Sequence, residues 1–388
     1  MQLTKDEEKS LSGEFGETMA SAYRILLSIG AATDAEKLVP IKWAHISGVN
    51  YNTIGDAGVE FLEEFSQNTK TAVKTTINPM GFDRGKVAAT NVSQSFIEQQ
   101  MKIVKSFESI GASPSFTCIP YEIFDIPPKG TVVSFAESNA AIYSNSVLGL
   151  FTNKESSLSA LASSITGKAP YSGLRIEEIR HPKVTIKSNI KLQTELDYGL
   201  LGYFAGNQIK DDCVALDGIS ENADMIKTKS LSAAMGTSGT CGMFARKEYG
   251  LRQDVVSFDQ GEMNKIRDEL NTSESGDIIV LGSPQLGISE LKFLTDQIRY
   301  KKFSKRCLIF CARKTYWQAE QIGLTGKIER AGSEFMCDSC ACLTPLVSKA
   351  DVDSVITNSV KGAYYLGHSN RVGVALKDLK TIIKEYSN

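Results

Sequence analysis

Residues 277–298 read DIIVLGSPQLGISELKFLTDQI, and this stretch decides the fold class. After Asp277 the chain is apolar without interruption up to Leu281, which is typical of a strand buried on both faces. The strand runs into the turn Gly282-Ser283-Pro284. Apolar residues then recur at the spacing of one helical face, at Ile288, Leu291, Leu294 and Ile298. A strand, a turn and an amphipathic helix in this order predict one unit of an α/β fold.

The same alternation extends in both directions along the chain. Strands are predicted over residues 38–47, 70–77, 113–119, 131–136, 307–311 and 372–376. Helices are predicted over residues 11–27, 96–110 and 379–386, and Thr53 with Asp56 is interpreted as the capping box of another helix. The alternation favours α/β layers with mostly parallel sheets. In such sheets ligands bind beside the carboxyl ends of the strands, so a ligand site is expected in the loops that follow the strands.

One segment, residues 207–249, has scattered Gly and Ser and weak periodicity. It is interpreted as a loop-rich insertion or a lobe boundary, and its glycine-rich run 236–240 as a turn, because that run matches neither phosphate-binding fingerprint. Shifts in composition divide the chain into three predicted lobes, 1–130, 131–275 and 276–388.

Composition narrows the functional class. The 388 residues carry 43 Lys and Arg against 45 Asp and Glu, a net charge of -2, so neither nucleic acid nor an anionic membrane is an expected partner. The uncharged stretches 138–153 and 230–245 are too rich in Ser, Asn, Thr and Gly to span a membrane. The N-terminal sequence MQLTKDEEKSL lacks the apolar core of a secretory signal. A cytoplasmic protein is expected.

The cysteines indicate metal chemistry. The chain has eight cysteines but three histidines, so a soft metal or an iron–sulfur cluster is favoured over a histidine-bound zinc ion. Cys118 lies at the end of a predicted strand. It is either a metal ligand or a small buried apolar residue. Cys337, Cys340 and Cys342 fit a zinc site, a redox pair or part of a cluster. In an extended strand, Cys340 and Cys342 would share a face.

Polar candidates follow the predicted strands. Glu137 comes directly after the strand 131–136 and is suited to orienting a hydroxyl or transferring a proton, whereas Ser138 beside it is equally suited to capping a helix. His45 is interpreted as a core histidine. Lys361 and Arg371 are either anion ligands or solvated surface cations.

Taken together, the motifs resemble one family. In the first half they are VNYNTIGDAG (49–58), TINPMG (76–81), TCIPY (117–121), ESNA (137–140), YSNSVLG (143–149), TNKE (152–155), SALA (159–162) and ITGK (165–168). In the second half they are DSC (338–340) and NSVKGAYY (358–365). This series resembles the large, catalytic subunit of the aconitase X family, over essentially the whole chain.

The resemblance implies an aconitase-like, multi-lobed fold of α/β/α layers and a hydro-lyase with an iron–sulfur cluster, of which 4Fe–4S is the expected type. The swivel domain is expected on a separate small subunit. Within the family the chain is similar to the archaeal-type phosphomevalonate dehydratases, which implies conversion of mevalonate 5-phosphate to trans-anhydromevalonate 5-phosphate in isoprenoid biosynthesis. A serine of the small subunit is implied as the base, so this chain alone is expected to be inactive.

The resemblance also implies site residues. Those expected to hold substrate are Gly48, Val49, Asn50, Asn78, Pro79, Glu137, Ser138 and Lys361, with Asn50 in place of an expected serine. Cys118 and Cys340 are implied as cluster ligands. The third ligand position is Ser283, where the family has cysteine, and Cys311 is the predicted substitute. A cis-3-hydroxyproline dehydratase-like hydro-lyase, a cluster-less binding protein and a structural zinc protein remain as alternatives.

Overall fold

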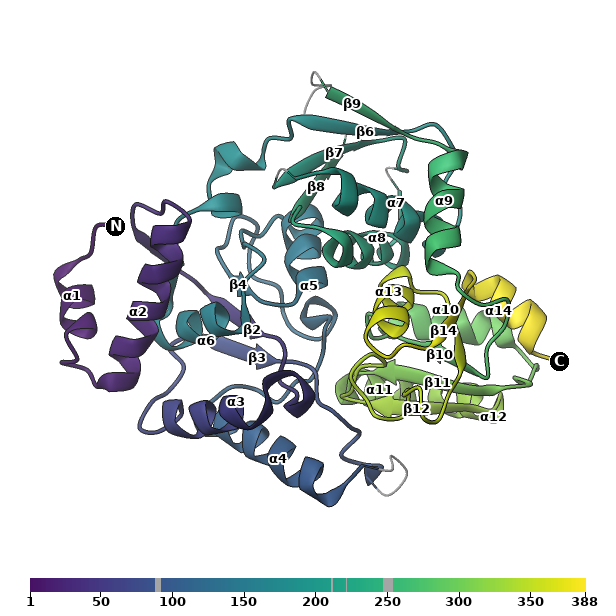
Figure 1. Ribbon diagram of the computed structural model, residues 1–388, viewed down its shortest axis with the longest axis horizontal. Coiled ribbons are helices and arrows are strands. Elements are labelled where there is room, and N and C mark those ends of the chain that lie inside the picture. The colour runs from purple at the N-terminus through teal and green to yellow at the C-terminus, as the bar shows by residue number, and fades with distance from the viewer. Residues whose placement is uncertain (88–91, 211, 221, 247–253) are drawn as a thin grey trace.

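The computed structural model of the protein describes residues 1–87, 92–210, 212–220, 222–246 and 254–388. Within these ranges the strands form three parallel sheets and one antiparallel pair, which confirms the predicted α/β fold with mostly parallel sheets. Figure 1 shows the three sheets with their helices grouped around the centre of the molecule and the two termini at opposite sides. No helix among the described residues is both long and apolar enough to cross a membrane.

The N-terminal sheet has the strand order β3-β2-β4. Its strands are β2 (Trp43–Ile46), β3 (Lys74–Ile77) and β4 (Ser134–Phe135), and β1 (Leu38–Pro40) pairs with β5 (Lys168–Pro170) beside it. The helices of this part are α1 (Lys5–Leu11), α2 (Glu17–Ala32), α3 (Tyr51–Phe65), α4 (Gln94–Ser109), α5 (Ser138–Tyr143) and α6 (Ser157–Thr166). Short helical turns are η2 (Pro120–Glu122), η3 (Ser144–Leu148), η4 (Gly173–Arg175) and η5 (Glu177–Arg180). Apolar faces of α2, α3, α4 and α6 share one core with β2 and β3.

Three local predictions in this part are wrong. The helix predicted over 11–27 is two helices, because Gly13 and Gly16 take positive φ angles between them. Residues 113–119 form no strand and contribute a single bridge, from Ser113 to β3. Helix α3 is capped by Asn50, whose side chain accepts from the backbone N–H of Asn52, and not by the predicted capping box.

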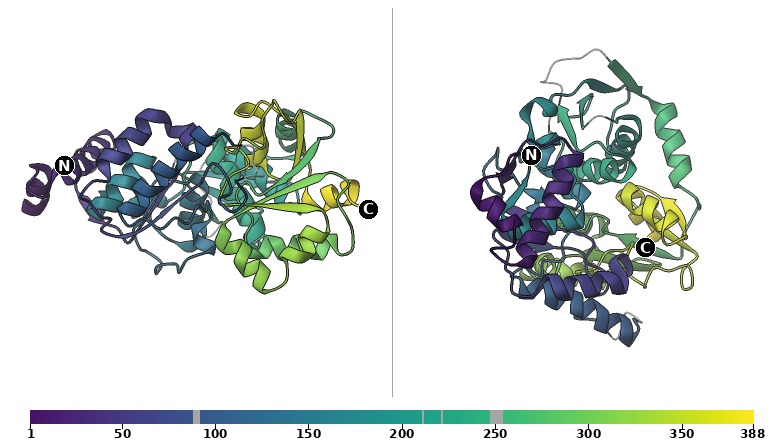
Figure 2. Two further views of the ribbon diagram at one scale, coloured as in Figure 1. Left: turned by 90° about the horizontal axis from the view of Figure 1, so that it is seen from below. Right: turned by 60° about the vertical axis from the view of Figure 1, so that its left-hand side comes forward.

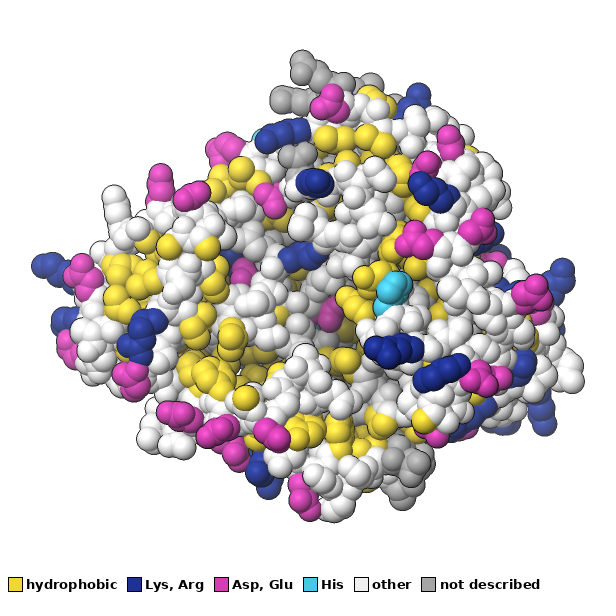
Figure 3. All heavy atoms as spheres, viewed as in Figure 1, with side chains coloured by type: hydrophobic (Ala, Val, Ile, Leu, Met, Phe, Trp, Pro, Cys, Tyr) yellow, Lys and Arg dark blue, Asp and Glu magenta, His cyan; other side chains and the backbone are white. Residues whose placement is uncertain are grey.

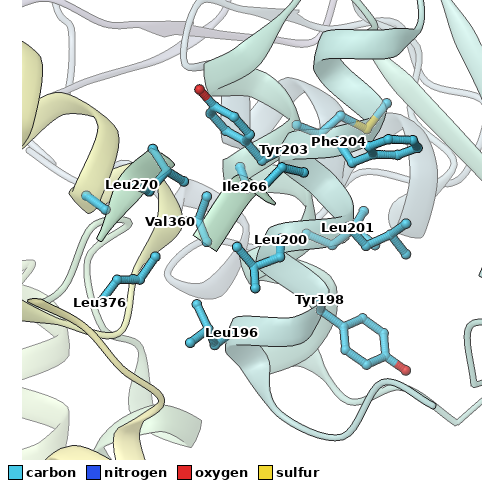
Figure 4. Packing of buried hydrophobic residues seen from close by; sticks show 14 of the residues in the cluster. Leu196, Tyr198, Leu200, Leu201, Tyr203, Phe204, Ile266, Leu270, Val360 and Leu376 are labelled. Atoms are coloured by element: carbon cyan, nitrogen blue, oxygen red, sulfur yellow. The ribbon is translucent and has the colours of Figure 1, made fainter. Parts of the chain in front are cut away.

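The middle sheet has the order β8-β7-β6-β9. Its strands are β6 (Val184–Ser188), β7 (Cys213–Asp217), β8 (Met243–Arg246) and β9 (Asp254–Phe258), and its helices are α7 (Glu195–Gln208), α8 (Met225–Ser238) and α9 (Gln260–Leu270). Figure 4 shows α7 side chains, among them Leu200, packed against Ile266 of α9 and Val360. Helix α7 is therefore apolar on nearly all sides.

The prediction of a loop-rich insertion at 207–249 is wrong for the described part, which contains β7, α8 and β8; residues 211, 221 and 247–249 lie outside the described ranges. Helix α8 packs against α5, α7 and α13, and small residues such as Ala233 and Ala234 are buried along it. A helix that is covered on several sides has no polar stripe, so its sequence lacks the usual period.

The C-terminal sheet has the order β12-β11-β10-β13-β14, with all neighbours parallel. Its strands are β10 (Ile278–Leu281), β11 (Arg306–Cys311), β12 (Ser333–Cys337), β13 (Ser354–Thr357) and β14 (Gly373–Leu376), and its helices are α10 (Ile288–Ile298), α11 (Arg313–Gln321), α12 (Thr325–Arg330), α13 (Val360–His368) and α14 (Leu379–Tyr386). Figure 2 shows helices on both faces of this sheet. Accordingly β10 alternates, with Val280 in the core that contains α13 and Leu281 in the core that contains α10.

Candidate active site

A cavity of about 430 Å³ lies where the carboxyl ends of the N-terminal and C-terminal sheets face one another. Ser47 follows β2, Asn78 follows β3 and Glu137 follows β4, while Gly282 to Gln285 follow β10. Figure 3 shows a hollow near the centre of this face, with acidic side-chain atoms visible inside it. The cavity therefore occupies the position in which parallel sheets bind their ligands.

Nine of the twelve residues singled out in the sequence line this cavity. They are Gly48, Asn78, Pro79, Cys118, Glu137, Ser138, Ser283, Cys340 and Lys361. The other three lie elsewhere. Val49 is buried behind the cavity wall, Asn50 caps α3, and Cys311 ends β11 beside Cys337 of β12.

Two glycines bring the backbone close to the cavity. Gly48 has a φ of 74°, and a Cβ there would lie 3.1 Å from the Ser157 hydroxyl oxygen. Gly282 has a φ of 110°, and its Cβ would lie 2.3 Å from the Phe310 carbonyl oxygen. Left-handed backbone and close approach together favour glycine at both positions. The loop that presents Ser283 is thus held tightly against β11.

Lys361 and Glu137 form the central ion pair of the cavity. Lys361 Nζ donates to Glu137 Oε1 at 2.6 Å, and Asn78 Nδ2 donates to Glu137 Oε2 at 3.2 Å. Only 13% of the Lys361 side chain and 12% of the Glu137 side chain are exposed. Lys361 is consequently a buried, paired cation, and Arg371, the other candidate, is exposed and lies outside the cavity lining.

Within this pair Glu137 stays ionised and Lys361 stays protonated at neutral pH. Burial alone would raise the pKa of Glu137, but the charge of Lys361 and the hydrogen bonds from Lys361 and Asn78 lower it below its ordinary value. Burial alone would lower the pKa of Lys361, but the charge of Glu137 raises it. Glu137 also occupies the N-cap position of α5, so the alternative in which Ser138 caps this helix does not hold. The Glu137 carboxylate makes no capping bond because Lys361 and Asn78 hold it.

His45 lies behind this pair as a fully buried residue of β2. Its Nδ1 lies 2.7 Å from the Thr76 hydroxyl, which also accepts from Trp43 Nε1 at 2.9 Å. Burial lowers the pKa of His45 to about 4, an effect that the nearby Glu137 charge only partly opposes. The imidazole is therefore neutral at physiological pH, as expected for a core histidine.

This gives a pH prediction. Between pH 6.5 and pH 4 the unfolded chain binds a proton at His45 that the folded chain does not, so the stability is complete above pH 6.5 and is lost as the pH falls. From pH 7.5 to pH 5 the loss is about 2 kcal/mol. Urea denaturation followed by the fluorescence of buried Trp43 measures it, with His45→Gln as the comparison. An equal pH dependence in the two proteins would contradict the assignment.

Three thiols line the cavity wall, those of Cys118, Cys340 and Cys342, and the Ser283 hydroxyl lies among them. Ser283 Oγ lies 3.8 Å from Cys342 Sγ. The prediction that Cys340 and Cys342 face one side is confirmed, although they lie in a turn after β12 and not in a strand; Ala341 between them packs into the core. Cys342 was one of three clustered cysteines considered for a zinc, redox or cluster site, but it was not assigned as a cluster ligand; Gln285 was not singled out at all. The alternation at 340–342 was the available signal for Cys342.

Gln285 fastens the cysteine-bearing segments to one another. Its backbone N–H donates to Cys118 Sγ at 3.1 Å, and its side-chain oxygen accepts from the Cys118 backbone N–H at 3.3 Å. Its Nε2 donates to the carbonyls of Phe116 and Ser339, at 3.1 and 3.0 Å. The side chain is buried, and these bonds join the segments around Cys118 and Cys340 to the loop after β10. Gln285 is thus a positioning residue for three parts of the cavity wall.

The cavity offers three thiols as donors for an iron–sulfur cluster. Among the residues in the described ranges, no three His, Cys, Asp or Glu side chains converge to hold one metal ion. Cys337 packs with β11 in a different core from the cavity, so Cys337, Cys340 and Cys342 do not form the zinc site considered above. An iron–sulfur cluster carries its iron atoms at separate corners, so its thiolate ligands surround it instead of meeting at one point. Thiols around a cavity are compatible with that arrangement.

Comparison with known proteins finds similarity to one family along nearly the whole chain. Profiles of the first, second and third domains of aconitase X match residues 1–178, 182–267 and 276–388. The crystal structure of Thermococcus kodakaraensis aconitase X in its holo-form superposes with a TM-score of 0.91 at 31% identity, and the match covers 100% of both chains.

Named relatives divide into two groups. The phosphomevalonate dehydratase large subunit of Methanocaldococcus jannaschii is 34% identical over 99% of this chain and 100% of its own length. The cis-3-hydroxy-L-proline dehydratase of Hypocrea jecorina is 32% identical over 94% of this chain, but the match covers 65% of that protein. The match covers at least 92% of each large subunit in the first group, but 65% of each protein in the second.

Proposed function

Because this chain belongs to the aconitase X family, we infer that it is the large subunit of a hydro-lyase that dehydrates mevalonate 5-phosphate to trans-anhydromevalonate 5-phosphate. Five archaeal relatives named phosphomevalonate dehydratase large subunit support this substrate. The observation that carries the inference is the cavity at the strand ends, in which a buried Lys361–Glu137 pair faces three thiols.

The substrate is a small anion with a carboxylate and a phosphate group. Lys361 supplies a cation that is 13% exposed, and a buried charge attracts an anion more strongly than a charge in water does. Glu137 and Asn78 offer an acceptor and a donor beside it, which suits a substrate hydroxyl. We assign these three residues to substrate binding, with the backbone around Gly48 and Pro79 completing the wall.

Cys118 and Cys340, with a third ligand on the side of Ser283, would hold an iron–sulfur cluster, and a 4Fe–4S cluster is the proposed type. When bound, the cluster supplies a Lewis acid that accepts the departing hydroxide, which is a poor leaving group without a metal. The backbone N–H of Gln285 donates to Cys118 Sγ, a contact of the kind that orients and tunes such ligands.

The proton acceptor is proposed to lie on the small subunit. A general base works best when its pKa lies near the working pH. At the cavity, Glu137 is held ionised with a lowered pKa, and the pKa values of Lys361 and Tyr365 are raised. None of the three is matched to proton abstraction at neutral pH. A base on the partner would also explain why the relatives of this length are named large subunits.

An anaerobic assay on mevalonate 5-phosphate tests the function. We expect product only when this chain, reconstituted with iron and sulfide, is mixed with the small subunit encoded nearest to it. Turnover by this chain alone would contradict the placement of the base. Activity of the pair on cis-3-hydroxy-L-proline, with none on mevalonate 5-phosphate, would instead support the hydroxyproline alternative, and a chain that binds no cluster would support the binding-protein alternative.

A further inference from the structure

The chain gathers three of its thiols at one cavity. Cys118, Cys340 and Cys342 line it, whereas the remaining cysteines pack in apolar clusters away from it, at Cys213, Cys241, Cys307, Cys311 and Cys337. Cys311 is fully buried at the end of β11, opposite Cys337 in the parallel register. The prediction that Cys311 serves as the third cluster ligand in place of Ser283 is therefore not supported, because Cys311 lies outside the cavity wall.

Cys342 is the thiol beside Ser283. Its sulfur lies 3.8 Å from the Ser283 hydroxyl oxygen, so the two side chains reach the same part of the cavity. The turn that carries Cys342 is closed by the backbone N–H groups of Leu343 and Thr344, which both donate to the Cys340 carbonyl at 3.0 Å. Burial of Ala341 in the core turns both neighbouring cysteines toward the cavity.

The Ser283 loop is fixed in place, with its side chain beside Cys342. The Ser283 carbonyl accepts from the Ser359 hydroxyl, and Gly282 fits closely against the carbonyl of Phe310. A serine hydroxyl must also lose a proton of very high pKa to bind iron, whereas a cysteine thiol is a far better acid and its thiolate is the softer ligand. Between two neighbouring side chains, the thiol is the better iron ligand.

We propose that Cys342 provides the third protein ligand of the cluster, together with Cys118 and Cys340, and that Ser283 stands beside it as a hydrogen-bond partner of the Cys342 sulfur. This proposal rests on the proposed function, since it presumes that the cavity holds an iron–sulfur cluster. It assigns to this chain a Cys-x-Cys pair, 340 and 342, as two of the three ligands.

The test measures bound iron and sulfide after anaerobic reconstitution of the full chain with ferrous iron and sulfide, followed by desalting, together with the visible absorption spectrum. In Cys342→Ser we expect the retained iron and sulfide to fall at least roughly tenfold. Ser283→Ala and Cys311→Ser, the matched controls, should retain the wild-type content. The double variant Cys342→Ser/Ser283→Cys should recover the cluster, because the new thiol replaces the old one from a position 3.8 Å away.

The outcomes separate the two proposals. If wild type binds no iron and sulfide, the proposed function fails along with this inference. If wild type binds a cluster and a folded Cys342→Ser variant keeps it, the inference is overturned and the function stands, whatever the result with Ser283→Ala. A folding defect in Cys342→Ser would be visible in its circular dichroism spectrum, and recovery in the double variant would then decide the matter. Failure of the double variant to recover the cluster, with a folded chain, would also overturn the inference.

Discussion

Lys361→Met is expected to reduce kcat/KM of the assembled enzyme by roughly 10³-fold and to destabilise the chain by about 3–5 kcal/mol. The variant removes the buried cation from the cavity and leaves Glu137 as a buried carboxylate without its 2.6 Å partner. The exposed Lys349, paired with Asp353 at 2.8 Å, offers a matched control: Lys349→Met removes a surface pair and should change the stability by no more than about 1 kcal/mol.

A double variant separates binding from folding. Lys361→Met/Glu137→Gln removes both charges, so most of the lost stability should return, as it does when a whole buried pair is neutralised. The activity should not return, because Lys361 and Glu137 are both assigned to substrate binding. Recovery of activity together with stability would show that Lys361 acts only through the fold.

Lys229→Met is expected to have the largest effect on stability away from the cavity lining, again about 3–5 kcal/mol. Lys229 lies on α8 and is 1% exposed. Its Nζ donates to Glu122 Oε1 at 2.9 Å, to the Gln285 carbonyl at 3.1 Å and to the carboxylate of Glu290. One cation thus joins the middle sheet to the turn after Cys118 and to the loop that carries Ser283.

Removal of that cation leaves two buried carboxylates facing each other. Burial already raises the pKa of Glu290 to about 7 with the lysine present. Chemical denaturation measures the effect, and Lys229→Met/Glu122→Gln/Glu290→Gln should recover most of the loss. Lys377 forms a pair of the same 2.9 Å length with Glu385 at the surface, so Lys377→Met should cost less than about 1 kcal/mol. Equal losses in the two single variants would contradict the role given to burial.

Periodicity predicted the layers and the place of the site because these depend on local pattern. The apolar run of β10 and the stripe of α10 are visible in the residues themselves. The rule that ligands bind at strand ends pointed to Asn78 and Glu137, which are far apart in the chain and line one cavity, whereas Ser283 was selected from the family resemblance. Helix α8 was missed because burial on several sides removes the periodic signal.

The neighbour of Ser283 could not be predicted in the same way. Cys311 and Cys342 are both distant from it in sequence, and the choice between them depends on a turn after β12 that faces the loop after β10. The ion cluster of Lys229, Glu122 and Glu290 likewise joins residues of three separate helical segments, α8, η2 and α10. Such pairings are decided by tertiary packing, which a single sequence does not encode in any local period.

The residues that line the cavity are spread along the chain from Ser47 to Ser369, so the cavity can form only late in synthesis of the protein. During translation the N-terminal sheet emerges from the ribosome long before Lys361 is synthesised. The Glu137 carboxylate therefore has no Lys361 partner until nearly the whole chain has been made. Likewise, the whole middle sheet and the strands β10, β11 and β12 lie between Cys118 and Cys340 in the sequence. The proposed cluster therefore requires residues translated late in synthesis, and chains truncated before Cys340 are expected to retain no iron and sulfide.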